Sequence, residues 1–289
     1  MQAISADTPG ICLQANGITL HCIEAGPKEG PLVILLHGFP EFWWGWRHHI
    51  EPLAEAGFRV LVPDQRGYNL SDRPEGRGAY DLDTLAKDVI GLSDALGYDR
   101  CSLVGHDWGG LVAWWTASLY PGRIERLAVL NAPHPAIAGS YLRRHPSQML
   151  RSSYIGFFQV PFLPEAMLSA GRYRALKRTL LRTSRAGTFS EQDLAEYEKA
   201  WARKGALTAM VNWYRALLLR PRSRSAGRLS MPVLALWGMR DQFLEYGLCE
   251  ESLALCDHPE VKPFEGASHW LHLEEADRVN DALLGFLQV

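Results

Sequence analysis

Cysteine is scarce in this 289-residue chain, and its positions follow no regular spacing. The five cysteines are odd in number and include no CxxC pair: Cys12, Cys22, Cys101, Cys249 and Cys256. This pattern argues against a disulfide framework and against a zinc site. It is typical of a protein kept in a reducing compartment, so we expect a cytoplasmic location.

Long apolar runs, repeats and a strong net charge are also absent. No apolar stretch approaches the ~18 residues of a membrane span. Residues 1–10 have neither the basic start nor the apolar segment of a signal peptide. A net charge of −2 gives no reason to expect nucleic-acid binding. The length suits one large domain, or a domain with an insertion.

Charge is nevertheless distributed unevenly along the chain. Residues 134–230 contain 17 Lys+Arg and 5 Asp+Glu, whereas the remainder contains 13 and 27. A basic middle segment between acidic flanks predicts two parts that face each other, with the basic part docked onto the acidic one. An anionic substrate or a membrane surface is the alternative partner for the basic segment. The oligomeric state stays open.

Short apolar runs rich in β-branched residues alternate with helical patterns, which indicates a mostly parallel sheet with crossover helices. We expect strands at 11–14, 18–24, 32–36, 59–62, 102–104, 127–130, 233–237 and 261–264. Helices are expected near 46–56, 83–96, 110–120, 245–254 and 274–286.

The alternation breaks after residue 131. From residue 134 to about residue 220 there is no good strand, and helices are expected at 172–182, 190–204 and 207–219, before an Arg/Ser-rich hinge at 221–227. The sequence therefore predicts an α/β protein with an eight-stranded, mostly parallel sheet. Its core comprises residues 1–133 and 225–289, and a helical cap, 134–224, is inserted between strands. Ligand sites in such sheets lie at the carboxyl ends of strands, where the cap would close.

The segment Gly105-His-Asp-Trp-Gly109 has the pattern of a nucleophile elbow, the sharp turn from a strand into a helix. Its apex, Asp107, is where many hydrolases have serine. A carboxylate attacks carbonyls poorly but displaces leaving groups from sp³ carbon, forming an ester on the enzyme. An epoxide or an alkyl halide is the expected electrophile. The alternative interpretation is an ordinary aspartate capping a helix.

Three further features follow predicted strands. The turn after 32–36 offers the Phe39 N–H, which with the Trp108 N–H would form an oxyanion hole. His269, after the last strand, is the candidate base that activates water, and Asp241 is the carboxylate that orients it. The order Asp107, Asp241, His269 is that of nucleophile, acid and histidine in the α/β-hydrolase fold.

Opening an epoxide releases an alkoxide, so the site needs a proton donor, and a tyrosine phenol can supply it. The cap segment contains Tyr154, in Ser153-Tyr-Ile-Gly-Phe-Phe-Gln159, and Tyr214, in Asn212-Trp-Tyr-Arg215. Composition alone makes both of them aromatic core residues.

The chain resembles, over nearly its whole length, the epoxide hydrolases of the α/β-hydrolase fold, of the soluble and microbial type. The resemblance lies in His37-Gly-Phe-Pro-Glu41, Asp64-Gln-Arg-Gly-Tyr68 with Ser71-Asp72, Gly105-His-Asp-Trp-Gly-Gly110, Asn212-Trp-Tyr-Arg215, Asp241 and His269-Trp270. Tyr154 and Tyr214 fall on the family's two cap tyrosines, although the first segment has one extra residue before its aromatic pair.

The resemblance implies a two-step hydrolysis to a vicinal diol. Asp107 would attack an epoxide carbon while Tyr154 and Tyr214 hydrogen-bond the ring oxygen, and His269 with Asp241 would then direct water onto the ester. No metal ion or other cofactor is expected. The expected partners are a small hydrophobic epoxide and water, bound near His37, Pro40, Phe157, Phe158, Trp213 and Trp270.

Haloalkane dehalogenase is the closest alternative, because it shares the Asp-Trp elbow. Halide-releasing relatives usually add a side-chain N–H donor where this chain has Phe39, and two cap tyrosines would be surplus. Fluoroacetate dehalogenases carry arginines just after the nucleophile, where this chain has Trp108 and Leu111. An esterase is disfavoured by Asp107, and a non-catalytic binding protein would not need every catalytic position filled. The particular epoxide and the stereochemical preference stay open.

Overall fold

The computed structural model describes residues 4–219 and 227–288. Its centre is an eight-stranded sheet in the order β1-β2-β4-β3-β5-β6-β7-β8. The strands are β1 (Ile11–Ala15), β2 (Ile18–Ala25), β3 (Leu32–Leu36), β4 (Arg59–Pro63), β5 (Cys101–His106), β6 (Ile124–Leu130), β7 (Leu229–Gly238) and β8 (Cys256–Phe264). All eight predicted strands are therefore confirmed, and β7 and β8 begin earlier than the apolar runs indicated.

The sheet is parallel from β4 to β8 in spatial order, and antiparallel only at the β1–β2–β4 edge. Asn16 and Gly17, both with positive φ, form the two-residue turn between β1 and β2, the geometry that tight hairpins favour. Every residue of β3 is buried, because helices cover both faces of a parallel sheet. The carboxyl ends of β3 to β8 consequently meet at one edge, where the site forms.

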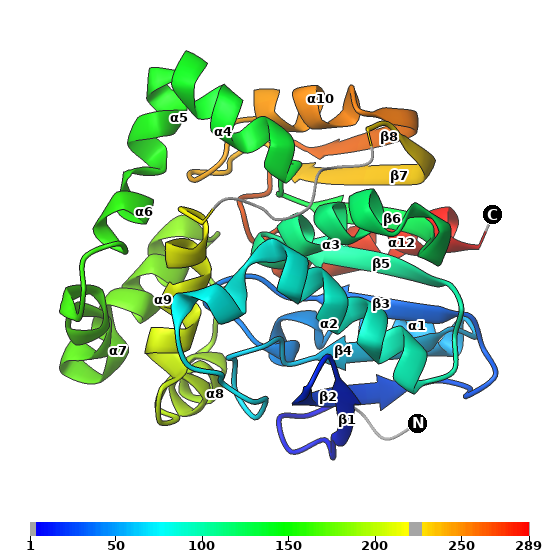
Figure 1. Ribbon diagram of the computed structural model, residues 1–289, viewed down its shortest axis with the longest axis horizontal. Coiled ribbons are helices and arrows are strands. Elements are labelled where there is room, and N and C mark those ends of the chain that lie inside the picture. Colours follow the sequence, from blue (N-terminus) through cyan, green and yellow to red (C-terminus); the bar gives the residue numbers. More distant parts are fainter. Residues whose placement is uncertain (1–3, 220–226, 289) are drawn as a thin grey trace.

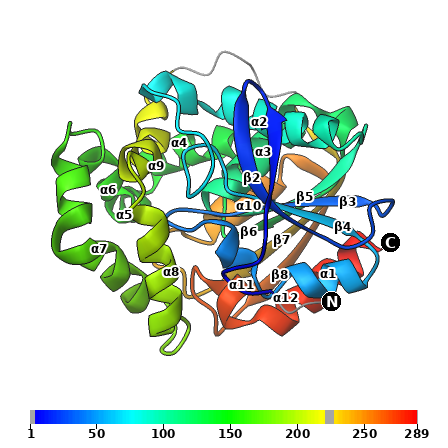
Figure 2. The same cartoon turned by 90° about the horizontal axis from the view of Figure 1, so that it is seen from below.

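Figure 2 shows α2 and α3 on one face of the sheet and α1 and α12 on the other. The core helices are α1 (Ile50–Glu55), α2 (Leu82–Ala95), α3 (Trp108–Leu119), α10 (Gly247–Leu253), α11 (Leu271–Glu274) and α12 (Ala276–Leu287), with 3₁₀ turns η1 (Trp43–Trp46), η2 (Arg77–Tyr80) and η3 (Pro121–Arg123). These elements match the five predicted core helices, with two of the predictions each split into two shorter pieces.

Between β6 and β7 the described residues contain helices and no strand, as predicted: α4 (Pro135–Arg144), α5 (Pro146–Arg151), α6 (Ser153–Phe157), α7 (Leu163–Thr183), α8 (Glu191–Trp201) and α9 (Ala206–Ala216). Helices α5 to α9 stand beyond one end of the sheet in both views (Figures 1 and 2). The sequence patterns missed α4, α5, α6 and the first half of α7. Non-helical angles at residues 170–173 divide α7 into two parts.

Within the described residues, no helix is both long and apolar enough to cross a membrane.

Two of the helices between β6 and β7 attach to loops of the core through buried tryptophans. Trp201 donates its indole N–H to the Pro40 carbonyl at 2.7 Å, and Trp213 donates to the Arg66 carbonyl at 3.0 Å. These loops follow β3 and β4, so the bonds fix α8 and α9 over the carboxyl ends of the strands.

Arginines of the basic segment also pair with glutamates of the acidic part. The pairs are Arg144–Glu251 at 2.6 Å, Arg151–Glu245 at 3.7 Å and Arg185–Glu275 at 2.7 Å. Exposed pairs of this kind contribute only about 0–1 kcal/mol each. Their charges, basic on the inserted segment and acidic on the core, are those expected from the predicted docking of a basic cap onto an acidic core.

The boundaries of the cap, 134 and 224, stay a prediction. Helix α4 lies beside α10, which belongs to the sequence after the cap (Figure 1), and the Tyr141 hydroxyl donates to Glu245 at 3.2 Å. By its contacts α4 is therefore tied to the core as closely as to α5. Residues 221–226 of the predicted hinge lie outside the described residues.

Candidate active site

The turn between β5 and α3 presents Asp107 at the sheet's carboxyl edge. Its backbone has φ 50° and ψ −120°, a region that non-glycine residues occupy only under strain. The flanking glycines explain how the turn can form. A methyl group on Gly109 would lie 2.1 Å from the Leu36 carbonyl oxygen, and one on Gly105 would lie 2.4 Å from the Gly109 oxygen. This is the geometry expected of a nucleophile elbow.

The Asp107 carboxylate is held by the loop after β3. Its Oδ1 accepts the Phe39 N–H at 2.8 Å, and only 16 % of the side chain is exposed. Burial on its own would raise the pKa of Asp107, but the hydrogen bond and charge of His269 outweigh it and lower the pKa below its usual value. Trp108 begins α3 directly after Asp107, and the first N–H groups of a helix have no partner within it.

His269 lies between two carboxylates. Its Nδ1 is 2.8 Å from Asp241 Oδ2, and its Nε2 is 3.6 Å from Asp107 Oδ2. The structure thus brings together three residues that are far apart in the sequence, in the arrangement of a nucleophile–histidine–acid triad.

Asp241 is itself oriented by several donors. Its Oδ1 accepts the Phe243 and Leu244 N–H groups at 2.7 and 3.0 Å, and its Oδ2 accepts the Asn131 side-chain amide at 2.5 Å. Asn131 is a functional residue that the sequence reasoning missed. Its position directly after β6, at the same edge as the triad, was the available signal.

The two carboxylates determine the protonation of His269. Burial lowers the pKa of this imidazole, but the charge of Asp241 and the hydrogen bonds and charge of Asp107 raise it to about 10. His269 is therefore an imidazolium at neutral pH while both carboxylates are ionised. Neutralising Asp107 removes one of the two causes that keep the proton on His269.

Tyr154 and Tyr214 meet above the triad. Their ring centroids are 5.8 Å apart, and the Tyr214 ring also packs at 5.0 Å on Trp108. Burial, together with the negative charge of Asp107, raises the pKa of both phenols above the usual value. Both hydroxyls consequently remain protonated and able to donate hydrogen bonds.

A cavity of about 700 Å³ opens onto these residues. Asp107, Trp108, Tyr154, Trp213 and Tyr214 line it at one side. Apolar side chains of α3, α4, α9, α10 and their flanking loops make most of the remaining wall, including Leu111, Leu142, Leu217, Leu218 and Leu248. The volume suits a ligand of drug-like size in a mainly hydrophobic setting.

Of the six predicted substrate-binding residues, Trp213 lines this cavity. The other five are engaged elsewhere. The His37 ring accepts the Gln65 N–H, the Pro40 carbonyl accepts the Trp201 indole, and the Trp270 indole donates to Thr183. Phe157 and Phe158 pack against each other, and Phe158 contacts the rings of Tyr154 and Tyr214. These five residues are not among those that line the cavity, and their role in binding substrate stays a prediction.

Comparison with protein families and curated proteins agrees with this geometry. The model of the alpha/beta hydrolase fold family matches residues 31–276. The AB hydrolase superfamily protein YfhM of Bacillus subtilis is 44 % identical over 96 % of both chains. Epoxide hydrolase A of Mycobacterium tuberculosis is 34 % identical, with 95 % of this chain and 96 % of that protein covered. The chain belongs to the epoxide hydrolases of the α/β-hydrolase fold.

Solved structures of this family are closely similar. The epoxide hydrolase of Bacillus megaterium, in complex with an inhibitor, has a TM-score of 0.88 and 29 % identity, covering 96 % of this chain and all of that one. Epoxide Hydrolase A of Mycobacterium thermoresistibile has a TM-score of 0.84 and 30 % identity, covering 97 % of this chain and 98 % of that one. The fold is thus shared with these epoxide hydrolases over nearly the whole chain.

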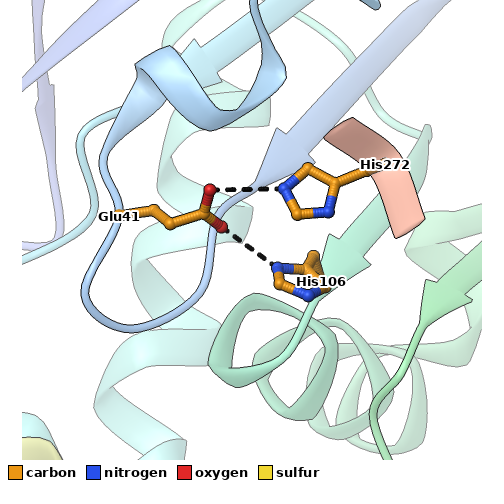
Figure 3. Close-up of side chains that lie close together, drawn as sticks. All are labelled: Glu41, His106 and His272. Atoms are coloured by element: carbon orange, nitrogen blue, oxygen red, sulfur yellow. Dashed lines mark hydrogen bonds and ion pairs between the residues drawn. The ribbon is translucent and has the colours of Figure 1, made fainter. Parts of the chain in front are cut away.

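A buried cluster of Glu41, His106 and His272 lies behind the triad (Figure 3). His106 Nδ1 is 3.1 Å from Glu41 Oε2, His272 Nε2 is 3.3 Å from Glu41 Oε1, and Tyr197 donates to the same Oε1 at 3.0 Å. These residue types can bind metal ions, but here the carboxylate itself lies between the rings and accepts a hydrogen bond from each. These hydrogen bonds explain why the three side chains lie close together.

The cluster connects the cap to the triad. Both ring nitrogens of His106 face oxygen atoms, since Nδ1 contacts Glu41 and Nε2 is 2.9 Å from the His269 carbonyl oxygen. Burial raises the pKa of Glu41, but His272 and His106 lower it well below its usual value. Burial lowers the pKa of His272 to about 3, which leaves that ring neutral. The cluster thereby holds the backbone of His269 in position.

Proposed function

We propose that this protein hydrolyses epoxides to vicinal diols through an alkyl ester on Asp107. One observation carries the proposal: an aspartate stands at the nucleophile elbow, 3.6 Å from a histidine that is 2.8 Å from a second aspartate. Serine at this position would favour acyl transfer, whereas a carboxylate favours displacement at sp³ carbon. The names of the relatives support the same substrate class.

In the first step, Asp107 Oδ2 attacks an epoxide carbon, and the carbon–oxygen bond of the ring breaks. The electron pair stays on the ring oxygen, which takes a hydrogen bond and then a proton from Tyr154 or Tyr214. The raised pKa of each phenol keeps this proton available. Asp107 Oδ1, bound by the Phe39 N–H, becomes the carbonyl oxygen of the ester.

In the second step, water hydrolyses this ester. Esterified Asp107 has no charge, so the pKa of His269 falls, and the imidazolium gives its proton, through solvent, to the tyrosinate that ring opening left. The neutral imidazole then accepts a proton from the attacking water, which restores the imidazolium. The hydroxide attacks the ester carbonyl carbon, and the Phe39 and Trp108 N–H groups stabilise the oxyanion. Removing one such donor typically costs ~10²–10³ in rate. The diol leaves and the carboxylate is restored, with no metal ion or cofactor in either step.

The haloalkane dehalogenase alternative is not favoured. The donor to Asp107 from the β3 loop is a backbone N–H of Phe39, whose side chain has no donor for a halide. Curated relatives such as epoxide hydrolase 4 of Mus musculus and epoxide hydrolase A of Mycobacterium tuberculosis are named as epoxide hydrolases.

Incubation with racemic styrene oxide, followed by chromatography for the diol, tests the proposal. The same assay with Asp107→Asn controls for spontaneous hydrolysis, and 1-bromobutane with halide detection tests the alternative. Diol formation that depends on Asp107 supports the proposal. Bromide release without diol formation, or equal diol formation by both proteins, would contradict it.

A further inference from the structure

The two segments that carry the cap tyrosines are joined to each other where their helices end. Tyr154 lies on α6, and Tyr214 lies in the last turn of α9. The last four carbonyl groups of a helix have no partner within it. Here such carbonyls accept hydrogen bonds from Gln159, which follows α6, and from Arg215, which follows Tyr214 directly. Neither Gln159 nor Arg215 takes part in the two steps proposed above.

Gln159 bridges α6 and α9 with a single side-chain amide. Its Nε2 donates to the Ile155 carbonyl, in α6, at 3.0 Å and to the Tyr214 carbonyl, in α9, at 3.1 Å. A glutamine amide nitrogen carries two hydrogens, so each hydrogen serves one helix. The amide therefore holds the backbone of Tyr214 against the helix that carries Tyr154.

Arg215 makes the connection in the opposite direction. Its Nε donates to the Phe158 carbonyl at 3.0 Å and its Nη2 to the Val160 carbonyl at 2.9 Å, both in the chain that follows α6. Glu165 binds the same guanidinium through both carboxylate oxygens, at 2.6 and 3.0 Å. Only 13 % of the Arg215 side chain is exposed. The ion pair fixes the direction of the guanidinium, so α9 is tied to the end of α6 a second time.

Ring opening requires the two phenols to be placed accurately. Each hydroxyl oxygen must come within about 3 Å of the same ring oxygen, so the two hydroxyl oxygens must lie within roughly 6 Å of each other. The ring centroids of Tyr154 and Tyr214 are 5.8 Å apart. A misplacement of about 1 Å at a reacting group can cost ~10² in rate. The separation of α6 and α9 therefore determines whether both phenols can donate at once.

We propose that Gln159 and Arg215 are positioning residues for ring opening, because they hold α6 and α9 at the separation at which Tyr154 and Tyr214 reach the same oxygen. This role rests on the proposed function. Neither Gln159 nor Arg215 is among the described residues that line the cavity, so each acts through the backbone of a tyrosine segment. Their loss should slow formation of the ester and leave its hydrolysis, which depends on the triad, unchanged.

Gln159→Met tests the role of the amide, because methionine has a similar length and no N–H donor. Ester formation and ester hydrolysis with styrene oxide are measured separately, by stopped-flow tryptophan fluorescence and by chemical quench. We expect ester formation to be slower by about fivefold or more and hydrolysis to stay within about twofold of the wild type. Gln192→Met, the same change at an exposed position of α8, should alter neither rate. Unchanged ester formation in Gln159→Met, or equal slowing of both steps, would overturn the proposal.

A double-mutant cycle with Tyr154→Phe separates alignment of the two phenols from a general loss of structure. Only one phenol remains in Tyr154→Phe, and the epoxide can then move with that phenol. Adding Gln159→Met to this variant should therefore slow ester formation by less than about twofold. If Gln159→Met slows ester formation equally in both backgrounds, Gln159 does not act on the pair of phenols and the proposal is wrong.

Arg215→Lys tests the second connection, and it replaces Gln159→Met as the test if a thermal melt shows that Gln159→Met does not fold. Lysine keeps a positive charge beside Glu165 but lacks the planar fork of donors that arginine presents. The variant should show the same selective slowing of ester formation, and a normal rate in the folded variant would contradict the proposal. A wild-type enzyme that forms no diol would refute the proposed function itself, whereas diol formation with equal rates in wild type and variants would refute only the role of Gln159 and Arg215.

Discussion

Replacing Asp107 with asparagine should remove most of the excess proton affinity of His269. The imidazole Nε2 lies 3.6 Å from Asp107 Oδ2, and the pKa of His269 is raised to about 10. At this distance and an effective dielectric constant of about 20, the charge pair is worth roughly 4.6 kcal/mol, or about three pKa units. Asp241 remains as the partner of Nδ1, so the variant's pKa should fall to near neutrality.

The change in pKa predicts a change in how stability depends on pH. In the wild type, folded His269 keeps a proton that the unfolded chain loses above its ordinary pKa of 6.5. The stabilisation is complete below pH 6.5 and is lost as pH rises toward 10, with a slope of about 1.4 kcal/mol per pH unit. In Asp107→Asn, His269 should contribute no slope above about pH 7.5, because its imidazole is then deprotonated in both the folded and the unfolded state.

Urea unfolding of both proteins between pH 7.5 and 9.5 measures this difference in slope. The range lies between the pKa of His269 in the variant and its pKa in the wild type. Other groups that titrate in this range are common to both proteins and cancel in the comparison. Asp99→Asn, the same charge change at an exposed position, should follow the wild type. If the free energy of unfolding of Asp107→Asn has the same slope as that of the wild type, Asp107 does not hold the proton on His269 and the electrostatic account of the triad is wrong.

Three further sets of substitutions test other parts of the account. Tyr154→Phe or Tyr214→Phe should slow ester formation in stopped-flow fluorescence, and the double variant should lose about 10²–10⁴ in that rate; a near-normal double variant would remove both phenols from the mechanism. Asp88→Ala leaves the buried guanidinium of Arg66 without its bidentate partner at 2.6 and 2.7 Å, so urea unfolding should show a loss of about 3–5 kcal/mol; a loss below 1 kcal/mol would contradict that reasoning. Gly109→Ala should not yield folded, active enzyme, since its methyl would lie 2.1 Å from a carbonyl oxygen of β3, and a soluble protein with normal diol formation would refute the steric argument.

Much of the core fold could be predicted from local pattern. Apolar runs such as 32–36 are buried on both faces and therefore leave a clear signal in the sequence. Gly105 of the elbow, which lies against Gly109, and the capping pair of Ser190 and Asp193, which forms at the start of α8, also act through neighbours in the chain. Such features require no knowledge of distant contacts.

The cap and the supports of the site depend on contacts that local pattern does not carry. Helices α5 and α6 are short. On α5 the apolar side chains of Met149 and Leu150 are exposed, so the apolar residues of this helix do not mark a single buried face. Pro40 and Trp270 lie next to functional residues in the sequence, yet their partners are Trp201 and a cap threonine. The pairing of Glu41 with residues from β5 and α11 likewise joins segments 65 and 231 residues apart, which only the folded chain reveals.

Intact-mass analysis of His269→Gln after exposure to styrene oxide tests the central claim most directly. Without its base the enzyme should form the ester on Asp107 but not hydrolyse it. The account predicts a mass increase of one substrate molecule, located on Asp107 by peptide mapping and absent from the double variant Asp107→Asn/His269→Gln. A wild-type enzyme that forms the diol while the variant accumulates no adduct, or an adduct on another residue, would contradict it.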